Sequence, residues 1–258
     1  MATFLFDEII FGPVHSRRLG ISLGINLLFL DAKFCNFNCI YCECGWTNNK
    51  LAKKDFHSRE TVAQALENKL KEMAEQNQLP DVITFAGNGE PTLHPDFEAI
   101  INDTINIRNK IAPQCKIAVL SNATMLHRKS VFNALNRIDN NILKLDSAIE
   151  STVKLINQPL GTFSINELKE HFKKFDSNFI IQTMFLRGIV NGTEIDNTTE
   201  EEVNAWLEII KETKPKQVML YSISRDTPLK DLQKVNEDTL NNIAEKVKQL
   251  GIDTLVTV

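Results

Sequence analysis

The sequence predicts a single α/β domain folded as a partial (β/α)6 barrel of the TIM-like type. Of the 258 residues, 43% are hydrophobic and 24% charged, a balance that supports a folded chain with a substantial core. Short apolar runs alternate with amphipathic stretches, which is typical of parallel strands covered by helices. Six such units fit into the chain, and its length leaves no room for the two further units of a complete barrel.

The strands are expected at short runs rich in β-branched and apolar residues. In chain order these runs are Ile25–Leu30, Val82–Ala86, Lys116–Leu120, Ile142–Leu145, Phe179–Phe185 and Val218–Ile223, with a closing strand over Asp253–Val258. Helices are expected at the amphipathic stretches Arg59–Gln76, Pro95–Ile111, Arg128–Ile138, Ile165–Phe175, Glu200–Thr213 and Glu237–Leu250. Ser58 and Thr199 are typical helix N-caps, and Gly251 is well placed to end the last helix.

Residues 1–24 precede the first expected strand, and we expect them to form an N-terminal extension that packs on a barrel over residues 25–258. In barrels of this kind the active site forms at the C-terminal ends of the strands. The candidate site segments are therefore the polar or Gly-rich stretches directly after the strands, at residues 31–46, 87–95, 121–124, 146–148, 187–192 and 224–228.

Charge and hydropathy restrict the partners and the location of the chain. The net charge of −4 does not support RNA as a partner, although a local basic patch that docks one RNA stays open. No run approaches the roughly 20 apolar residues that span a bilayer, so no membrane segment is expected. The first eleven residues carry Asp7 and Glu8 but no Lys or Arg, unlike a secretory signal, and we expect a cytoplasmic protein.

Four of the five cysteines lie within ten residues, in the loop after the first expected strand. In a reducing compartment, the cluster of Cys35, Cys39, Cys42 and Cys44 indicates a metal or cofactor site. Structural zinc sites usually pair two short knuckles from separate chain positions, whereas iron–sulfur clusters accept closely spaced thiolates from one loop. The spacing therefore favours an iron–sulfur cluster. Cys44 is expected to be a spare or structural thiol, and Cys115 a core residue.

A second candidate segment follows the second expected strand and contains Gly87, Asn88, Gly89 and Glu90. Glycines allow a ligand to approach the backbone closely, and a glutamate accepts hydrogen bonds from an ammonium group. Taken alone, this segment is equally well interpreted as an ordinary turn without a binding role. Its position after the strand that follows the cysteine loop favours a binding role.

The spacing Cys-x3-Cys-x2-Cys, with Tyr41 just before the third cysteine, resembles the signature of the radical S-adenosylmethionine (SAM) superfamily. The turn at residues 87–90 is similar to the Gly-Gly-Glu motif of that superfamily. The resemblance implies that Cys35, Cys39 and Cys42 hold a [4Fe–4S] cluster whose fourth iron binds SAM. It further implies reductive cleavage of SAM to a 5′-deoxyadenosyl radical, an external electron donor of the flavodoxin or ferredoxin type, and chemistry carried by the cofactors.

The resemblance also gives expected roles to polar residues at the ends of later strands. These residues would bind the ribose, carboxylate or methionine part of SAM, and they are Ser121, Asn122, Asp146, Ser147, Gln182 and Thr183. Single polar residues at strand ends are often turn or cap residues, so both interpretations stay open for each of them.

The segment Phe11–Asn26, together with the cysteine motif, resembles proteins related to the wyosine-base (4-demethylwyosine) tRNA synthases. Those synthases hold a second cluster with upstream cysteines, and this sequence has no cysteine before Cys35. The substrate therefore stays unassigned, with a tRNA base or a small molecule as the expected classes. Arg17, Arg18 and Arg187 are candidate substrate contacts because guanidinium groups suit phosphates and carboxylates. Surface ion pairs are the alternative.

Two other functions stay open at this point. A glycyl-radical-enzyme activase is similarly short and carries one cluster, and it would act on a large protein partner. A non-catalytic zinc- or cluster-binding regulatory module would bind metal without SAM. The glycine turn counts against the second alternative, since a simple metal module has no need of a second binding segment.

Overall fold

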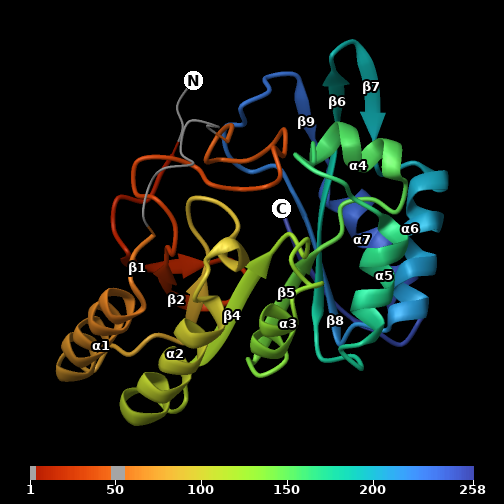
Figure 1. The fold of residues 1–258 in the computed structure, drawn as a ribbon. Helices are drawn as coiled ribbons and strands as arrows, with labels where there is room; N and C mark the ends of the chain where they lie inside the picture. The colour runs from red at the N-terminus through yellow and green to blue at the C-terminus, as the bar shows by residue number, and fades with distance from the viewer. Residues whose placement is uncertain (1–3, 48–55) are drawn as a thin grey trace.

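The described part of the chain forms a ten-stranded sheet with helices along its outer side (Figure 1). The structure is a computed structural model that describes residues 4–47 and 56–258. The main path of the sheet runs β1-β2-β3-β4-β5-β6-β8-β10, with all neighbours from β2 to β10 parallel. These strands are β1 (Ile10–Ser16), β2 (Gly20–Ile25), β3 (Val82–Phe85), β4 (Lys116–Ser121), β5 (Asn140–Lys144), β6 (Ile180–Val190), β8 (Gln217–Ser222) and β10 (Asp253–Thr257).

Helices connect successive parallel strands, as the amphipathic stretches predict. They are α1 (Arg59–Glu75), α2 (Phe97–Ile111), α3 (Lys129–Leu135), α4 (Glu150–Ile156), α5 (Ile165–Lys173), α6 (Glu200–Thr213) and α7 (Glu237–Lys248). Both predicted N-caps form, because Ser58 accepts a hydrogen bond from Thr61 N and Thr199 accepts one from Glu202 N. Within the described ranges, no helix combines the length and the apolar character needed to cross a membrane.

The predicted partial barrel is confirmed: the edge strands β1 and β10 do not pair with each other in the described part of the chain. One side chain links the two edges. Arg17, in the turn before β2, donates hydrogen bonds to Val258 O at 3.2 Å and to Ser224 Oγ at 2.7 Å. The expected boundary between extension and barrel, at residues 24 and 25, falls at the end of β2.

Several elements differ from the expectation. The first parallel strand covers Gly20–Ile25, whereas residues 26–30 form a loop; the prediction of a strand over Ile25–Leu30 is wrong. Leu27 and Leu28 are fully buried in that loop, so the apolar run indicated burial and not strand geometry. β6 continues to Val190 and forms a hairpin with β7 (Thr193–Asp196), and β9 (Leu232–Lys234) also pairs with it. The expected loop at residues 187–192 is therefore mostly strand.

The described part of the chain has three buried apolar clusters, two of which form layers on opposite faces of the sheet because successive strand residues point to opposite faces. The third joins the cysteine loop to the later strands and includes Ile40, Met184 and Tyr221. The larger layer lies between sheet and helices and includes Ile83 and Trp206. A smaller apolar cluster lies inside the barrel and consists of Val82, Ala118, Ile142, Ile180 and Met219. Each of these residues is among the first three of its strand. The inner cluster therefore fills the barrel near the strand N-termini and leaves the C-terminal ends for a site.

Candidate functional site

A cavity of about 320 Å³ opens at the C-terminal ends of the strands. Its wall contains residues from the cysteine loop after β2, from the glycine turn after β3, and from the ends of β4, β5 and β8. The long strand β6 contributes Gln182 and Met184 from its first half. In Figure 1 the cysteine loop lies at the same end of the molecule as the tips of β6 and β7. The structure therefore brings the two principal sequence motifs into one cavity.

Hydrogen bonds between main chains hold the cysteine loop against its neighbours. Phe34 N donates to Asn88 O at 2.8 Å, and Glu90 N donates to Phe34 O at 3.1 Å, so this loop and the glycine turn pair directly. On the other side, Ile40 N donates to Ile156 O at 2.9 Å, at the end of α4. The loop is thus fixed between β3 and α4.

The sulfurs of Cys35 and Cys39 lie in the cavity wall and accept N–H hydrogen bonds. Cys35 Sγ accepts from Phe37 N at 3.4 Å and from Asn122 Nδ2 at 3.7 Å. Cys39 Sγ accepts from Asn157 Nδ2 at 3.4 Å. Burial raises the pKa of Cys35 to about 12 and also raises the pKa of Cys39. Donors of this kind are found around the sulfurs of iron–sulfur clusters, where they tune the potential.

Cys42 has a different environment. A hydrogen bond from the Cys44 thiol and the nearby Lys33 ammonium lower the pKa of Cys42 to about 5, although burial opposes them. Lys33 is itself 3% exposed, and its Nζ donates to Gly45 O at 2.9 Å. Burial lowers the pKa of Lys33, but the charges of Cys42, Cys35 and Cys39 outweigh it, so the net shift is upward. A buried ammonium thus lies among the three thiols.

The glycine turn has a backbone that only glycine tolerates at two positions. Gly87 has φ +142° and Gly89 has φ +143°. A Cβ at Gly89 would lie 1.8 Å from Phe34 O, so the close pairing with the cysteine loop requires glycine there. The Asn88 side chain points away from the cavity. Its Nδ2 donates to Phe6 O and Phe29 O, and its Oδ1 accepts from Phe6 N.

Glu90 is 2% exposed and receives hydrogen bonds from the end of β4. Its Oε1 accepts from Thr92 N at 3.1 Å, Thr92 Oγ1 at 2.5 Å and Ser121 Oγ at 2.8 Å. Its Oε2 accepts from Asn122 N at 2.6 Å and from no other donor among the described residues. Burial raises the pKa of Glu90, and the hydrogen bonds oppose this shift without cancelling it. Because a carboxylate oxygen has two lone pairs, Oε2 keeps capacity for one more donor from the cavity.

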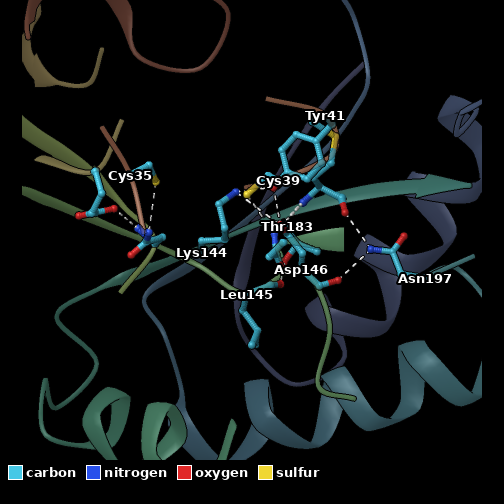
Figure 2. Close-up of polar contacts among 12 residues, drawn as sticks. Cys35, Cys39, Tyr41, Lys144, Leu145, Asp146, Thr183 and Asn197 are labelled. Atoms are coloured by element: carbon cyan, nitrogen blue, oxygen red, sulfur yellow. Dashed lines mark hydrogen bonds and ion pairs between the residues drawn. The ribbon is translucent and has the colours of Figure 1, made fainter. Parts of the chain in front are cut away.

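A buried polar network extends from Tyr41 at the cavity wall (Figure 2). Lys144 Nζ donates to Tyr41 OH at 2.5 Å, and Tyr41 OH donates to Asp146 Oδ2. Asp146 Oδ2 also accepts from Asn157 Nδ2 at 2.6 Å, and its Oδ1 accepts from Met184 N at 2.9 Å. Because Asn157 also reaches Cys39, the network connects the aromatic residue of the cysteine motif to β5, β6 and α4. Asp146 itself does not contribute to the cavity wall.

The structure separates the other candidate residues into two groups. Ser121, Asn122 and Gln182 lie in the cavity wall. Ser147 instead donates to Glu202 Oε2 at 2.6 Å, and Thr183 donates to Leu145 O at 2.7 Å, both outside the cavity. Thr183 follows Gln182 directly in β6, and adjacent strand residues face opposite sides of the sheet.

The three candidate arginines do not converge. Arg18 lies in the cavity wall, with its Cζ 4.7 Å from the centroid of the Tyr221 ring. Arg17 makes the contacts with Val258 and Ser224 described above, outside that wall. Arg187 lies in the β6–β7 hairpin, where its Nε is 2.8 Å from Asp196 Oδ2.

Sequence reasoning gave no individual role to several residues of the cavity wall, among them Lys33, Lys144 and Tyr221. A signal existed for two of them. Lys33 lies two residues before Cys35, and Lys144 is a charged residue inside an otherwise apolar predicted strand. Such a lysine is rarely buried unless it has a partner or a function. Tyr221 gave no signal beyond its position at the end of a strand.

Comparison with curated proteins gives relatives over most of the chain. The chain is 31% identical to the GTPase Obg of Brachyspira hyodysenteriae over 245 residues, which cover 93% of this chain and 33% of that protein. It is 32% identical to a UPF0026 protein of Methanocaldococcus jannaschii over 217 residues, which cover 82% of this chain and 62% of the relative. The chain thus spans less than two thirds of the length of both.

Solved structures show the same fold at low identity. A radical SAM methyltransferase from Sphaerobacter thermophilus superposes with a TM-score of 0.66 at 12% identity, covering 92% of this chain and 65% of that one. TYW1 with a lysine–pyruvate adduct bound superposes with a TM-score of 0.62 at 16% identity, covering 88% and 73%. The family model of the radical SAM superfamily matches residues 30–186. The chain therefore belongs to the radical SAM superfamily, whose cofactors are SAM and a [4Fe–4S] cluster.

Proposed function

We propose that this chain cleaves SAM reductively to a 5′-deoxyadenosyl radical, which abstracts hydrogen from a second substrate bound in the same cavity. The observation that carries the proposal is the convergence of the three thiols and the glycine turn on one cavity at the strand ends. When bound, the cluster supplies one electron, taken from an external flavodoxin- or ferredoxin-like donor, that breaks the carbon–sulfur bond and releases methionine.

Cys35, Cys39 and Cys42 fit the cluster. All three lie in the wall of one cavity, and the sulfurs of Cys35 and Cys39 accept N–H hydrogen bonds. The Lys33 ammonium acts to lower the pKa of all three cysteines and so favours thiolates, although burial outweighs it at Cys35 and Cys39. Cys44 is within hydrogen-bonding distance of Gly87 O at 3.4 Å, and we assign it to the support of the glycine turn. With these three residues as its protein ligands, the cluster would keep one iron free to bind SAM.

The glycine turn and the end of β4 fit the methionine part of SAM. Gly87 and Gly89 present backbone without side chains, and Glu90 Oε2 has capacity for an ammonium donor. Ser121 and Asn122 position the Glu90 carboxylate by donating to it. We assign Gln182 to the ribose or the methionine because its side chain lies in the same wall.

Anaerobic reconstitution with iron and sulfide, followed by electron paramagnetic resonance with and without SAM, tests the proposal. We expect a reduced four-iron signal that changes on addition of SAM, and formation of 5′-deoxyadenosine. A colourless protein that binds only zinc, or a cluster whose signal is indifferent to SAM, would overturn the proposal and favour the regulatory module.

A pair of cysteine variants tests the ligand assignment. Cys39→Ala should lose the cluster, whereas Cys44→Ala should keep iron and sulfide at the level of the unmodified protein. Iron and sulfide assays after gel filtration measure both. Retention of the cluster in Cys39→Ala, or its loss in Cys44→Ala, would show that the ligands are wrongly assigned.

A further inference from the structure

Part of the cavity wall is not used by the proposed cofactor contacts. The cluster and SAM are assigned to the cysteine loop, the glycine turn and the end of β4. The remaining wall includes Lys144 from β5 and Tyr221 from β8, and Arg18 reaches it from the turn between β1 and β2. This part of the cavity, whose total volume is about 320 Å³, thus carries two cationic side chains, which favour an anionic ligand.

Arg18 holds the principal unpaired donor of this wall. Its guanidinium lies over the Tyr221 ring, 4.7 Å from the centroid, which fixes its plane by a cation–π contact. Among the residues that the structure describes, Arg18 Nη1 is buried and has no hydrogen-bond partner. A buried donor of a charged group left without a partner costs free energy, so such groups in native proteins normally meet a ligand, a water or an ion.

The carboxylates in the cavity wall are engaged elsewhere. Glu43 Oε2 is 2.6 Å from Arg225 Nη1, and Glu90 accepts hydrogen bonds from Thr92, Ser121 and Asn122. Within the described ranges, neither carboxylate contacts Arg18, and no ion pair involves this side chain. The charge of Arg18 is therefore not compensated by the described part of the chain, although the chain is acidic overall.

Lys144 adds a second cation to the same wall. Its Nζ donates to Tyr41 OH at 2.5 Å and lies 3.5 Å from the buried Asp146 Oδ2. Asp146 balances the charge, so Lys144 stays in place when the cavity has no anion. An ammonium group has three donors, and these two contacts leave one for the cavity.

We propose that the second substrate carries an oxyanion, a carboxylate or a phosphate, which Arg18 binds beside Tyr221 with Lys144 as an additional donor. A guanidinium suits both anions because its parallel N–H groups match two oxygens. This inference rests on the proposed function only in assigning the rest of the cavity to SAM. The alternative source of the anion is the carboxylate of SAM itself, which the experiment distinguishes.

Isothermal titration calorimetry on the reconstituted, oxidised protein tests the inference, with inorganic phosphate, acetate and SAM titrated separately. We expect one of the two small anions to bind to the unmodified protein. Arg18→Gln should weaken that anion about 10-fold to 100-fold, and Arg18→Lys should recover part of the loss because it keeps the charge. The affinity for SAM should stay within about twofold in both variants. Preference for phosphate or for acetate identifies the substrate group.

Arg137→Gln is the matched control, because Arg137 is exposed, pairs with Glu98 outside the cavity and carries the same charge. Equal weakening of the anion by Arg137→Gln, or no weakening by Arg18→Gln, would overturn the inference. A loss of SAM affinity in Arg18→Gln as large as that of the anion would assign Arg18 to SAM and also overturn it. Failure of the unmodified protein to bind or cleave SAM would instead contradict the proposed function, while its anion titration still decides the role of Arg18.

Discussion

Replacing Glu90 with Gln removes one negative charge from the cavity wall and keeps the size of the side chain. The amide must place its NH2 group at one of the two former oxygen positions. At Oε1 it would face donors from Thr92 and Ser121, so the less unfavourable position is Oε2, 2.6 Å from Asn122 N. Two N–H donors that face each other in a buried site lower the free energy of unfolding by about 2 kcal/mol. For a chain of this size that loss lowers Tm by about 4–8 °C.

The effect on SAM affinity follows from the lost charge. A hydrogen bond from an ammonium to a carboxylate contributes about 2 kcal/mol, so we expect SAM to bind about 30-fold more weakly. Calorimetric titration of SAM into the reconstituted Glu90→Gln variant measures this, with iron content determined on the same sample. Glu98→Gln, on the partly exposed face of α2, is the control for loss of one charge.

An unchanged Kd for SAM, at full iron content, would refute the assignment of the ammonium to Glu90. Loss of iron in Glu90→Gln, with the control unaffected, would show that the hydrogen bonds of the Glu90 carboxylate to Thr92, Ser121 and Asn122 are needed to hold the cluster site together. Weaker SAM binding with the cluster intact is the expected result.

Three further changes have effects that follow from the contacts. Gly89→Ala should abolish SAM binding, because its Cβ would lie 1.8 Å from the backbone of the cysteine loop. The control Gly161→Ala, which has open space around it, should bind SAM normally. Equal SAM binding by both variants would contradict the close pairing of the glycine turn with the cysteine loop. Lys144→Met should lower the free energy of unfolding in urea by about 3 kcal/mol, since it leaves the buried Asp146 without its cation, and a loss under 1 kcal/mol would count against that ion pair. Asn88→Ala should cost about 2–3 kcal/mol in the same assay, because three hydrogen bonds are lost, and full stability with weak SAM binding would make Asn88 a cofactor ligand instead.

The fold class and the two principal motifs were predictable because their signals are local. Alternating apolar runs and amphipathic stretches predict parallel strands with covering helices whatever the distant contacts are. The one misplaced strand shows the limit of this signal. Leu27 and Leu28 are as buried as strand residues but lie in a loop, because apolar character reports burial and not backbone geometry.

The candidate site was most completely predictable where one segment carries the whole pattern, although Ser121, Asn122 and Gln182 also lie in the cavity wall as expected. The spacing of Cys35, Cys39 and Cys42 is contained in one loop, and so is the sequence of the glycine turn. The sequence near a residue does not determine in which direction its side chain points. Thr183 was expected in the site with Gln182, but the pleat of β6 turns it to the opposite face, where it bonds to Leu145 O.

By itself, the sequence determined the kind of cofactor, because ligand spacing within a loop is a property of the local chain. Only the tertiary structure decided what surrounds that cofactor. Arg18 lies more than a hundred residues before Lys144 and Tyr221 in the sequence, and the curvature of the sheet brings the three residues to one wall of the cavity. This proximity depends on strand order and register, which arise from the packing of the whole domain and leave no mark in the sequence near each residue.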